Sequence, residues 1–257
     1  MSGTFTPAPG AAPFHRQVLT QASMETRLIL RNGEHLLLAV VIPMIALIGG
    51  TLAARRLDLD FANRPIDVLT PGVLALAVMS TSFTSLAIAT GFERRYGLLK
   101  RLGASPLPRT GLLLGKVLAL LLVQVFQVVV IGVVGLALGW DPDPGAAGIL
   151  YAVLAALLGT CAFAGLGLTI AGTLRAEATL AGANLIYLLL LAGGAVVMPR
   201  DSYGSAEPLL QVLPSAALGD ALRAAFLDGS LDGGALVVLA LWAAGGALLA
   251  GRFFKWE

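Results

Sequence analysis

Long apolar runs separated by short polar segments fill the sequence from residue 35 onward. Several of these runs reach the ~20 residues that an α-helix needs to cross a bilayer. The runs are continuous rather than alternating, which excludes the pattern of a transmembrane β-barrel. The sequence therefore predicts an all-α polytopic membrane protein with six transmembrane helices. These helices are predicted at residues 35–54, 71–91, 112–139, 147–174, 178–198 and 235–253.

Residues 16–31 predict a helix that does not span the membrane. It has an apolar face and a polar face, with Val18, Ala22 and Ile29 on the first and Thr20, Arg27 and Arg31 on the second. Because this amphipathic helix directly precedes a span, we expect it to lie in the cytoplasmic membrane interface. Residues 1–15 before it are rich in Pro, Gly, Ala and Thr, contain no signal-peptide core and are predicted to be a disordered tail.

The outer segment between the fifth and sixth spans is also predicted to contain helix. Ser215 can cap a helix that runs to Leu227, with Asp220 and Arg223 close together on its polar side. A preceding apolar stretch, bracketed by two prolines, is too short to cross a bilayer. This segment is either re-entrant from the outer face, which its apolar content favours, or a surface loop packed on the bundle. Its candidate residues are Pro208, Pro214, Leu218, Leu222 and Phe226.

The distribution of charge predicts the orientation of the spans. With the N-terminus inside, most of the 17 Lys and Arg residues fall in inner segments, and most of the 15 Asp and Glu residues fall in outer ones. The positive-inside rule then places both termini in the cytoplasm. Arg55 and Arg56, just after the first span, are the local exception.

Composition agrees with a membrane protein and limits its chemistry. The chain is 57% hydrophobic and 12% charged, roughly half the charged fraction of a soluble domain. The stretch GLLLGKV at 111–117 resembles a P-loop only superficially, because it is one residue short between its glycines and Val117 replaces the magnesium-binding Ser or Thr. His15 and His35 lie far from any second metal ligand in the sequence. We therefore expect no catalytic, cofactor or metal site in this chain, and no nucleic-acid partner.

The polar side chains within the spans are mostly uncharged. Lys116, close to the inner boundary, is the only charge in a span interior, which argues against an ion-coupled carrier with an ionisable relay. The uncharged groups have two interpretations, namely hydrogen bonds between helices or a weakly polar translocation surface for amphipathic cargo. The candidate residues of that surface are Ser80, Thr81, Thr84, Gln124, Gln127, Asn184 and Tyr187.

The densest positive charge lies between the second and third spans, at residues 92–111. The pattern predicts a short helix over 93–102, because Glu93 stands at its start and Lys100 at its end, as the helix dipole favours. Its leucines fall together at one-turn spacing. An apolar knob with a basic rim between two spans predicts a docking element for a cytoplasmic protein. The candidate docking residues are Glu93, Arg94, Arg95, Gly97, Leu98, Leu99, Lys100, Arg101, Leu102, Ser105 and Pro106.

The stretch ERRYGLLKRLGASPLPRTGLLLGK, residues 93–116, resembles the cytoplasmic signature of ABC-2 type transporter permeases. In that family a Glu-Arg pair, a glycine, leucines and a Ser-Pro motif occupy the loop between the second and third spans. The likeness extends from Arg16 to the outer segment at 213–226. Residues 16–257 are therefore identified as one ABC-2 type transmembrane domain, most similar to the short drug-export permeases.

The resemblance implies a half-transporter of the bacterial cytoplasmic membrane, surrounded by membrane lipids. Two copies of a separate ATP-binding subunit would bind ATP and Mg²⁺ and receive the 93–102 segment as a coupling helix. A second permease copy, identical or paralogous, would complete the dimer. The cargo would be an amphipathic drug, antibiotic or lipid-like molecule. The alternatives are a stand-alone secondary carrier, a membrane-embedded enzyme and an assembly subunit that transports nothing.

Overall fold

The computed structural model describes residues 12–31, 33, 37–56, 63–98, 101 and 107–253. Within these ranges every regular element is helical, and six helices are long and apolar enough to cross a membrane. The prediction of an all-α protein with six candidate spans is thus confirmed for the described part of the chain. The expected tail at 1–15 lies mostly outside it.

The six candidate spans follow one another up and down along the chain. Two further parts are added to them, the N-terminal helix α1 and a helical segment between the last two spans. The N-terminal helix α1 is Phe14–Arg31. The first span comprises a π-helical turn, η1 (Leu37–Val41), and α3 (Ile42–Arg56); the second comprises α4 (Pro65–Met79), the π-helical η2 (Ser80–Ser85) and α5 (Leu86–Arg95). The remaining spans are α7 (Arg109–Ala137), α8 (Gly145–Thr173), α9 (Ala176–Gly193) and α12 (Gly233–Phe253). Between α9 and α12 lie η3 (Arg200–Ala206), α10 (Glu207–Leu210) and α11 (Pro214–Leu227).

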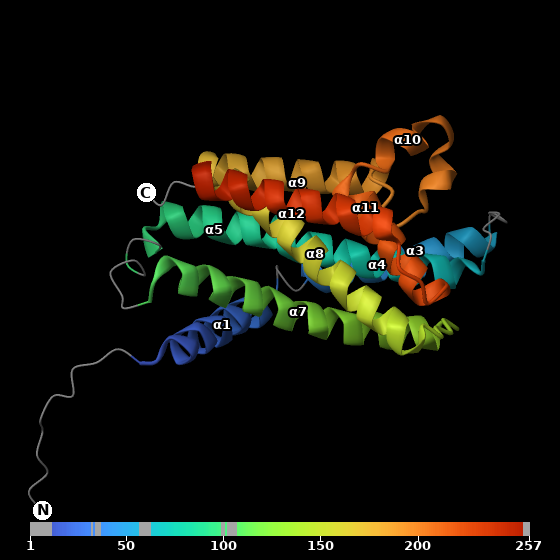
Figure 1. Ribbon diagram of the computed structural model, residues 1–257, viewed down its shortest axis with the longest axis horizontal. Helices are drawn as coiled ribbons and strands as arrows, with labels where there is room; N and C mark the ends of the chain where they lie inside the picture. The colour runs from blue at the N-terminus through green and yellow to red at the C-terminus, as the bar shows by residue number, and fades with distance from the viewer. Residues whose placement is uncertain are drawn as a thin grey trace, which may run out of the picture.

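The second span runs through the middle of the bundle. In Figure 1, α4 and α5 lie between α7 on one side and α9 and α12 on the other. The segment from Ile66 to Ile88 is buried throughout, and it carries much of the hydrophobic core. Phe83 in η2 meets Phe163 of α8 edge to face, with ring centroids 6.5 Å apart. The polar η2 turn is therefore a buried part of the core.

The second span is longer than the sequence pattern predicted. The predicted start of this span, at residue 71, was wrong because the helix begins six residues earlier. The helix instead begins at Pro65 and contains Pro71. Asp67 is buried there because Arg64 donates to its carboxylate with an Nε–Oδ2 distance of 2.7 Å. The positive end of the helix dipole also favours a carboxylate in this first turn.

Helix α1 lies along the first half of α7 (Figure 1). Val18 and Ala22 are buried against it, as predicted for the apolar face of α1, and Ile29 is half-buried. Glycines make the contact close, because a Cβ on Gly115 would come within 2.6 Å of the Gln21 side chain. The opposite face of α1 exposes Leu19.

The bundle has two distinguishable ends. The start of α1, the ends of α5 and α12 and the start of α9 lie together on the left of Figure 1, and we call this the basic end. Helices α10 and α11 lie at the opposite end. The basic end includes Arg94, Arg95, Arg175 and Arg252.

Two glycines bring α8 and α12 into backbone contact. A Cβ built on Gly165 would lie 2.6 Å from the carbonyl carbon of Gly246. Real Cβ atoms do not approach a backbone so closely, and the backbone cannot move aside as a flexible side chain can. Only glycine at position 165 therefore permits this crossing.

Replacing Gly165 by Ala is expected to push α8 and α12 apart and to destabilise the fold by about 1–3 kcal/mol, as overpacking does. The midpoint of thermal unfolding in detergent should fall by about 5 °C. Gly245→Ala is the matched control, because a Cβ at Gly245 meets no atom within 4 Å. Equal midpoints for the two variants would contradict the close crossing.

Candidate functional site

The predicted docking segment begins as the end of a membrane span. Helix α5 continues through Glu93 and Arg94 to Arg95, so the expected separate helix starting at Glu93 was wrong. The span absorbs these residues because their side chains find partners on neighbouring helices. The chain then turns at Gly97, whose φ of +68° favours glycine. Of the other candidates, Leu98 and Arg101 are described, whereas Leu99, Lys100, Leu102, Ser105 and Pro106 lie outside the described residues.

Lys116 forms a buried ion-pair cluster at the basic end. Its Nζ lies 2.9 Å from Glu25 Oε1 of α1 and 2.7 Å from the carboxylate of Glu93 at the end of α5. The side chains of Lys116, Glu25 and Glu93 are only 4%, 11% and 14% exposed. Gln21 supports the cluster by donating to Glu25 over 2.9 Å. Helices α1, α5 and α7 are therefore joined by one buried cation.

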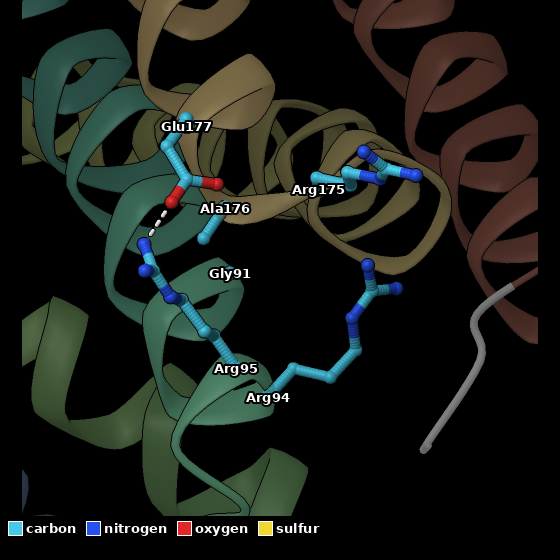
Figure 2. Close-up of a pocket in the computed structure, with 6 residues that line it drawn as sticks. All are labelled: Gly91, Arg94, Arg95, Arg175, Ala176 and Glu177. Carbon is cyan, nitrogen blue, oxygen red and sulfur yellow. Dashed lines mark hydrogen bonds and ion pairs between the residues drawn. The ribbon is translucent and has the colours of Figure 1, made fainter.

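The next two residues of α5 reach the turn between α8 and α9. Arg94 donates to the main-chain carbonyls of Gly172, in the last turn of α8, and of Leu174, which follows that helix. Arg95 forms an ion pair with Glu177 in the first turn of α9, drawn as a dashed line in Figure 2. The three consecutive residues 93–95 thus connect α5 to α7, α8 and α9, and through Lys116 to α1.

Two apolar side chains just beyond these contacts are exposed at the surface. Tyr96 is 70% exposed and Leu98 is 37% exposed. Tyr96 stacks on Phe92, with ring centroids 6.1 Å apart, so its ring is held on the last turn of α5. Tyr96 and Leu98 are therefore exposed apolar side chains directly beside the contacts of residues 93–95, and Tyr96 was not among the predicted docking residues.

The uncharged polar residues of the spans meet inside the chain. Thr81 donates to Gln127 over 2.9 Å, and Gln127 donates to the carbonyl of Ala39 over 2.6 Å. Gln124 receives a hydrogen bond from Thr160, at 3.0 Å, and donates to Ser82, at 2.8 Å. These contacts tie α7 to η1, η2 and α8, as expected for hydrogen bonds between helices.

The other candidates for a translocation surface are also mostly enclosed. Ser80, Thr84 and Tyr187 are buried, and Asn184 is half-buried. Within one chain these residues lie toward the core around η2 rather than on an open face. A role for any of them along a transport path stays a prediction.

The outer segment folds close to its predicted form. Helix α11 begins at Pro214, two residues before the start that a cap at Ser215 implies, and ends at Leu227 as predicted. Leu218 and Leu222 are buried in the core, and Phe226 meets Trp140 edge to face at 5.4 Å between ring centroids. Pro208 is exposed in α10. Whether this segment is re-entrant in a membrane stays a prediction.

Ser215 does not cap this helix as predicted. The residue before the helix is Leu213, and no side chain caps the first turn. Pro214 at the first helical position explains the difference, because its ring presets the helical backbone and it has no N–H to satisfy. The Ser215 hydroxyl instead donates to the carbonyl of Gly194 over 2.7 Å.

A buried arginine holds an unwound segment after α9. The fifth span was predicted to continue to residue 198, but α9 ends at Gly193. The guanidinium of Arg223 donates hydrogen bonds to three carbonyl oxygens of this segment, those of Ala195, Val196 and Val197, each over 3.3 Å. These bonds replace the helical hydrogen bonds that the segment lacks, which explains why the apolar run does not stay helical.

The predicted proximity of Asp220 and Arg223 is confirmed, at 2.9 Å, but the pair is not on a solvated face. Arg223 is only 5% exposed. Asp220 also pairs with Arg200 of η3. Charge is tolerated here because the guanidinium is neutralised by one carboxylate and hydrogen-bonded to backbone carbonyls.

Two features of these sites escaped sequence analysis. Glu25 was not assigned any role, although the lone lysine inside a span required a counter-charge. Arg223 was assigned to a polar face because helical spacing describes only its own helix. In both cases the partner comes from an element far along the chain.

Comparison with known protein families accounts for this architecture. The family model described as ABC-2 type transporter matches residues 16–227, which is most of the chain. No curated protein sequence matches the chain significantly. The domain of this family has no nucleotide-binding site, and its permeases pair with separate ATP-binding subunits, so the expectation that this chain is not itself the ATPase is confirmed. The chain belongs to the ABC-2 type transporter family and is a multi-pass membrane subunit of an ABC transporter.

Proposed function

We propose that this chain is the permease of a bacterial exporter and that ATP-binding subunits move it by pressing on the loop after α5. Two such subunits and a second permease copy, identical or paralogous, would complete the transporter. The observation that carries this proposal is the set of contacts made by Glu93, Arg94 and Arg95. These three residues reach four other helices, so a displacement of the loop would move most of the bundle.

The charge distribution supports placing the loop on the cytoplasmic side. The basic end carries Lys116 and four arginines around the ends of the spans, and positive charge at span ends marks the cytoplasmic face. Both chain termini would then be cytoplasmic. Helix α1 would lie in the inner interface, with its exposed Leu19 toward lipid and Arg27 toward headgroups.

An amphipathic cargo fits the polar groups that this chain offers. The spans carry amides and hydroxyls around η2, and these groups can hydrogen-bond a neutral or weakly polar molecule. They are internal in the single chain, so cargo would meet them when the helices around η2 separate. The outer segment from Pro208 to Phe226 would shape the exit, as a re-entrant element or as a packed surface loop.

The exposed pair Tyr96 and Leu98 is the expected contact with the ATP-binding subunit. Leu98→Arg should lower the amount of this subunit that co-purifies with the chain from its native host by about tenfold, the effect of losing one interface hot spot. The measurement is mass spectrometry of the affinity-purified, detergent-solubilised complex. Leu209→Arg is the matched control, because Leu209 is 72% exposed at the opposite end.

Three results would contradict the proposal. Equal recovery of the ATP-binding subunit with Leu98→Arg and with the native chain would exclude this docking surface. An equal loss of the co-purified ATP-binding subunit in the Leu98 and Leu209 variants would show that the loss comes from a general folding defect and not from this surface. Recovery of the chain alone, with transport in ATP-free vesicles driven by an ion gradient, would instead establish a secondary carrier.

A further inference from the structure

A cavity at the basic end is surrounded by arginine side chains. It lies between the end of α5 and the turn joining α8 to α9, and it has a volume of about 350 Å³. Figure 2 shows Arg94 and Arg175 extending along one side of it and Arg95 reaching Glu177 on the other. Gly91, which has no side chain, and Ala176, which has only a methyl group, complete the lining and leave the space open.

The cavity has an excess of positive charge. Its three arginines face a single carboxylate, Glu177, and that carboxylate is already paired with Arg95. Arg94 donates only to uncharged carbonyl groups. Arg175 is exposed, and its side chain has no hydrogen bond or ion pair with any described residue. Within the described part of the chain, the guanidinium groups of Arg94 and Arg175 therefore have no counter-ion.

The start of α9 adds to this positive potential. Arg175 is extended, with φ −71° and ψ 155°, and no side chain caps the first turn of the 18-residue helix. The first backbone N–H groups of a helix have no internal acceptors, and the helix dipole places partial positive charge there. Free donors, helix dipole and arginines together favour an anion with several acceptor oxygens.

The position of the cavity indicates where that anion comes from. Helix α5 ends at Arg95, α8 ends at Thr173 and α9 begins at Ala176, and each of these residues is an end of a candidate membrane span. The cavity therefore lies at the level where spans leave the apolar layer. Phosphate groups of phospholipids occupy that level of a bilayer, and basic pockets between spans bind anionic headgroups.

We propose that this cavity binds the phosphate group of an anionic phospholipid, with Arg175 and Arg94 as its principal donors. The planar guanidinium of Arg175 can give two parallel hydrogen bonds to phosphate oxygens. The site shares Arg94 with the proposed docking segment, but Arg175 lies in the α8–α9 turn, outside that segment, so substitution of Arg175 tests lipid binding separately from docking. Inorganic phosphate shares the recognised chemistry, and the test separates it from lipid.

The experiment measures thermal unfolding of the purified full-length chain in neutral detergent. Dioleoylphosphatidylglycerol is titrated as the anionic probe, dioleoylphosphatidylcholine as the zwitterionic probe, and sodium phosphate as the free anion. Phosphatidylglycerol should raise the unfolding midpoint of the native chain and phosphatidylcholine should not. In Arg175→Gln, half-saturation should need about fivefold more phosphatidylglycerol, the usual contribution of one basic residue at a membrane surface.

Two further variants sharpen the test. Arg252→Gln removes an exposed basic residue at the end of α12 and should leave the titration unchanged. Glu177→Gln removes the competing carboxylate, frees Arg95 and should lower the half-saturating concentration. This gain in affinity cannot arise from a variant that merely folds poorly.

Several outcomes would overturn the proposal. Equal stabilisation by the two lipids would exclude recognition of the anionic headgroup. The same loss of phosphatidylglycerol affinity in Arg252→Gln as in Arg175→Gln would show that the lipid responds to general surface charge and not to this cavity. Stabilisation by millimolar sodium phosphate alone, abolished in Arg175→Gln, would make this a site for free phosphate rather than for lipid.

Discussion

Lys116→Met is expected to destabilise the protein by about 3–5 kcal/mol, the usual cost of removing one partner from a buried ion pair. The change keeps an unbranched side chain only one atom shorter but leaves Glu25 and Glu93 facing each other without a cation. Both carboxylates are mostly buried, so water cannot replace the ammonium group. The unfolding midpoint in detergent should fall by roughly 10 °C.

The control for this prediction removes the whole cluster. A triple variant, Lys116→Met with Glu25→Gln and Glu93→Gln, has no buried charge to leave unpaired and should recover most of the lost stability. Leu114→Met is an exposed substitution in the same helix and should change little. A single variant as stable as the native chain would show that Lys116 is not the link between α1 and α5.

Arg223→Met should have an effect at least as large, because one substitution removes several interactions together. Three carbonyl groups at 195–197 lose their donor, and each buried carbonyl left unpaired costs about 1–3 kcal/mol. Asp220 also loses one of its two cationic partners. The unfolding midpoint should fall by more than 10 °C, and limited proteolysis should cut first near residues 194–199.

Arg200→Met is the matched control, since Arg200 pairs with the same carboxylate. Its side chain is 29% exposed, against 7% for Arg223. A pair of this kind contributes about 1 kcal/mol or less, so Arg200→Met should lower the midpoint only slightly. Equal effects of the two substitutions would mean that the ion pair with Asp220 matters and the backbone carbonyls do not.

The features that the sequence predicted correctly are those fixed by neighbouring residues. Six apolar runs of sufficient length gave six candidate spans, because a helix satisfies its own backbone and needs only length and apolarity to cross a bilayer. Helix α11 was predicted within two residues of its start and with its correct end. The Asp220–Arg223 pair followed from helical spacing alone.

The features that were missed depend on contacts between distant segments. The second span was predicted to start at residue 71, but Arg64 neutralises the carboxylate of Asp67 and the helix extends outward to Pro65. Lys116 is paired with Glu25, a residue 91 positions away along the chain. No periodicity in the sequence relates two such positions. The charge of Lys116 therefore showed that an acidic partner was needed, but the sequence did not show which residue it was.

The break after α9 has a consequence for how this protein is made. The carbonyl groups of Ala195, Val196 and Val197 are bonded to a guanidinium that lies 26–28 residues later in the chain. Translation proceeds from the N-terminus, so α9 leaves the ribosome before its stabilising arginine has been synthesised. The hydrogen bonds of residues 195–197 therefore form late in biogenesis. In a chain truncated before α11, the three carbonyl groups would lack their donor and the segment would be exposed to quality-control proteases.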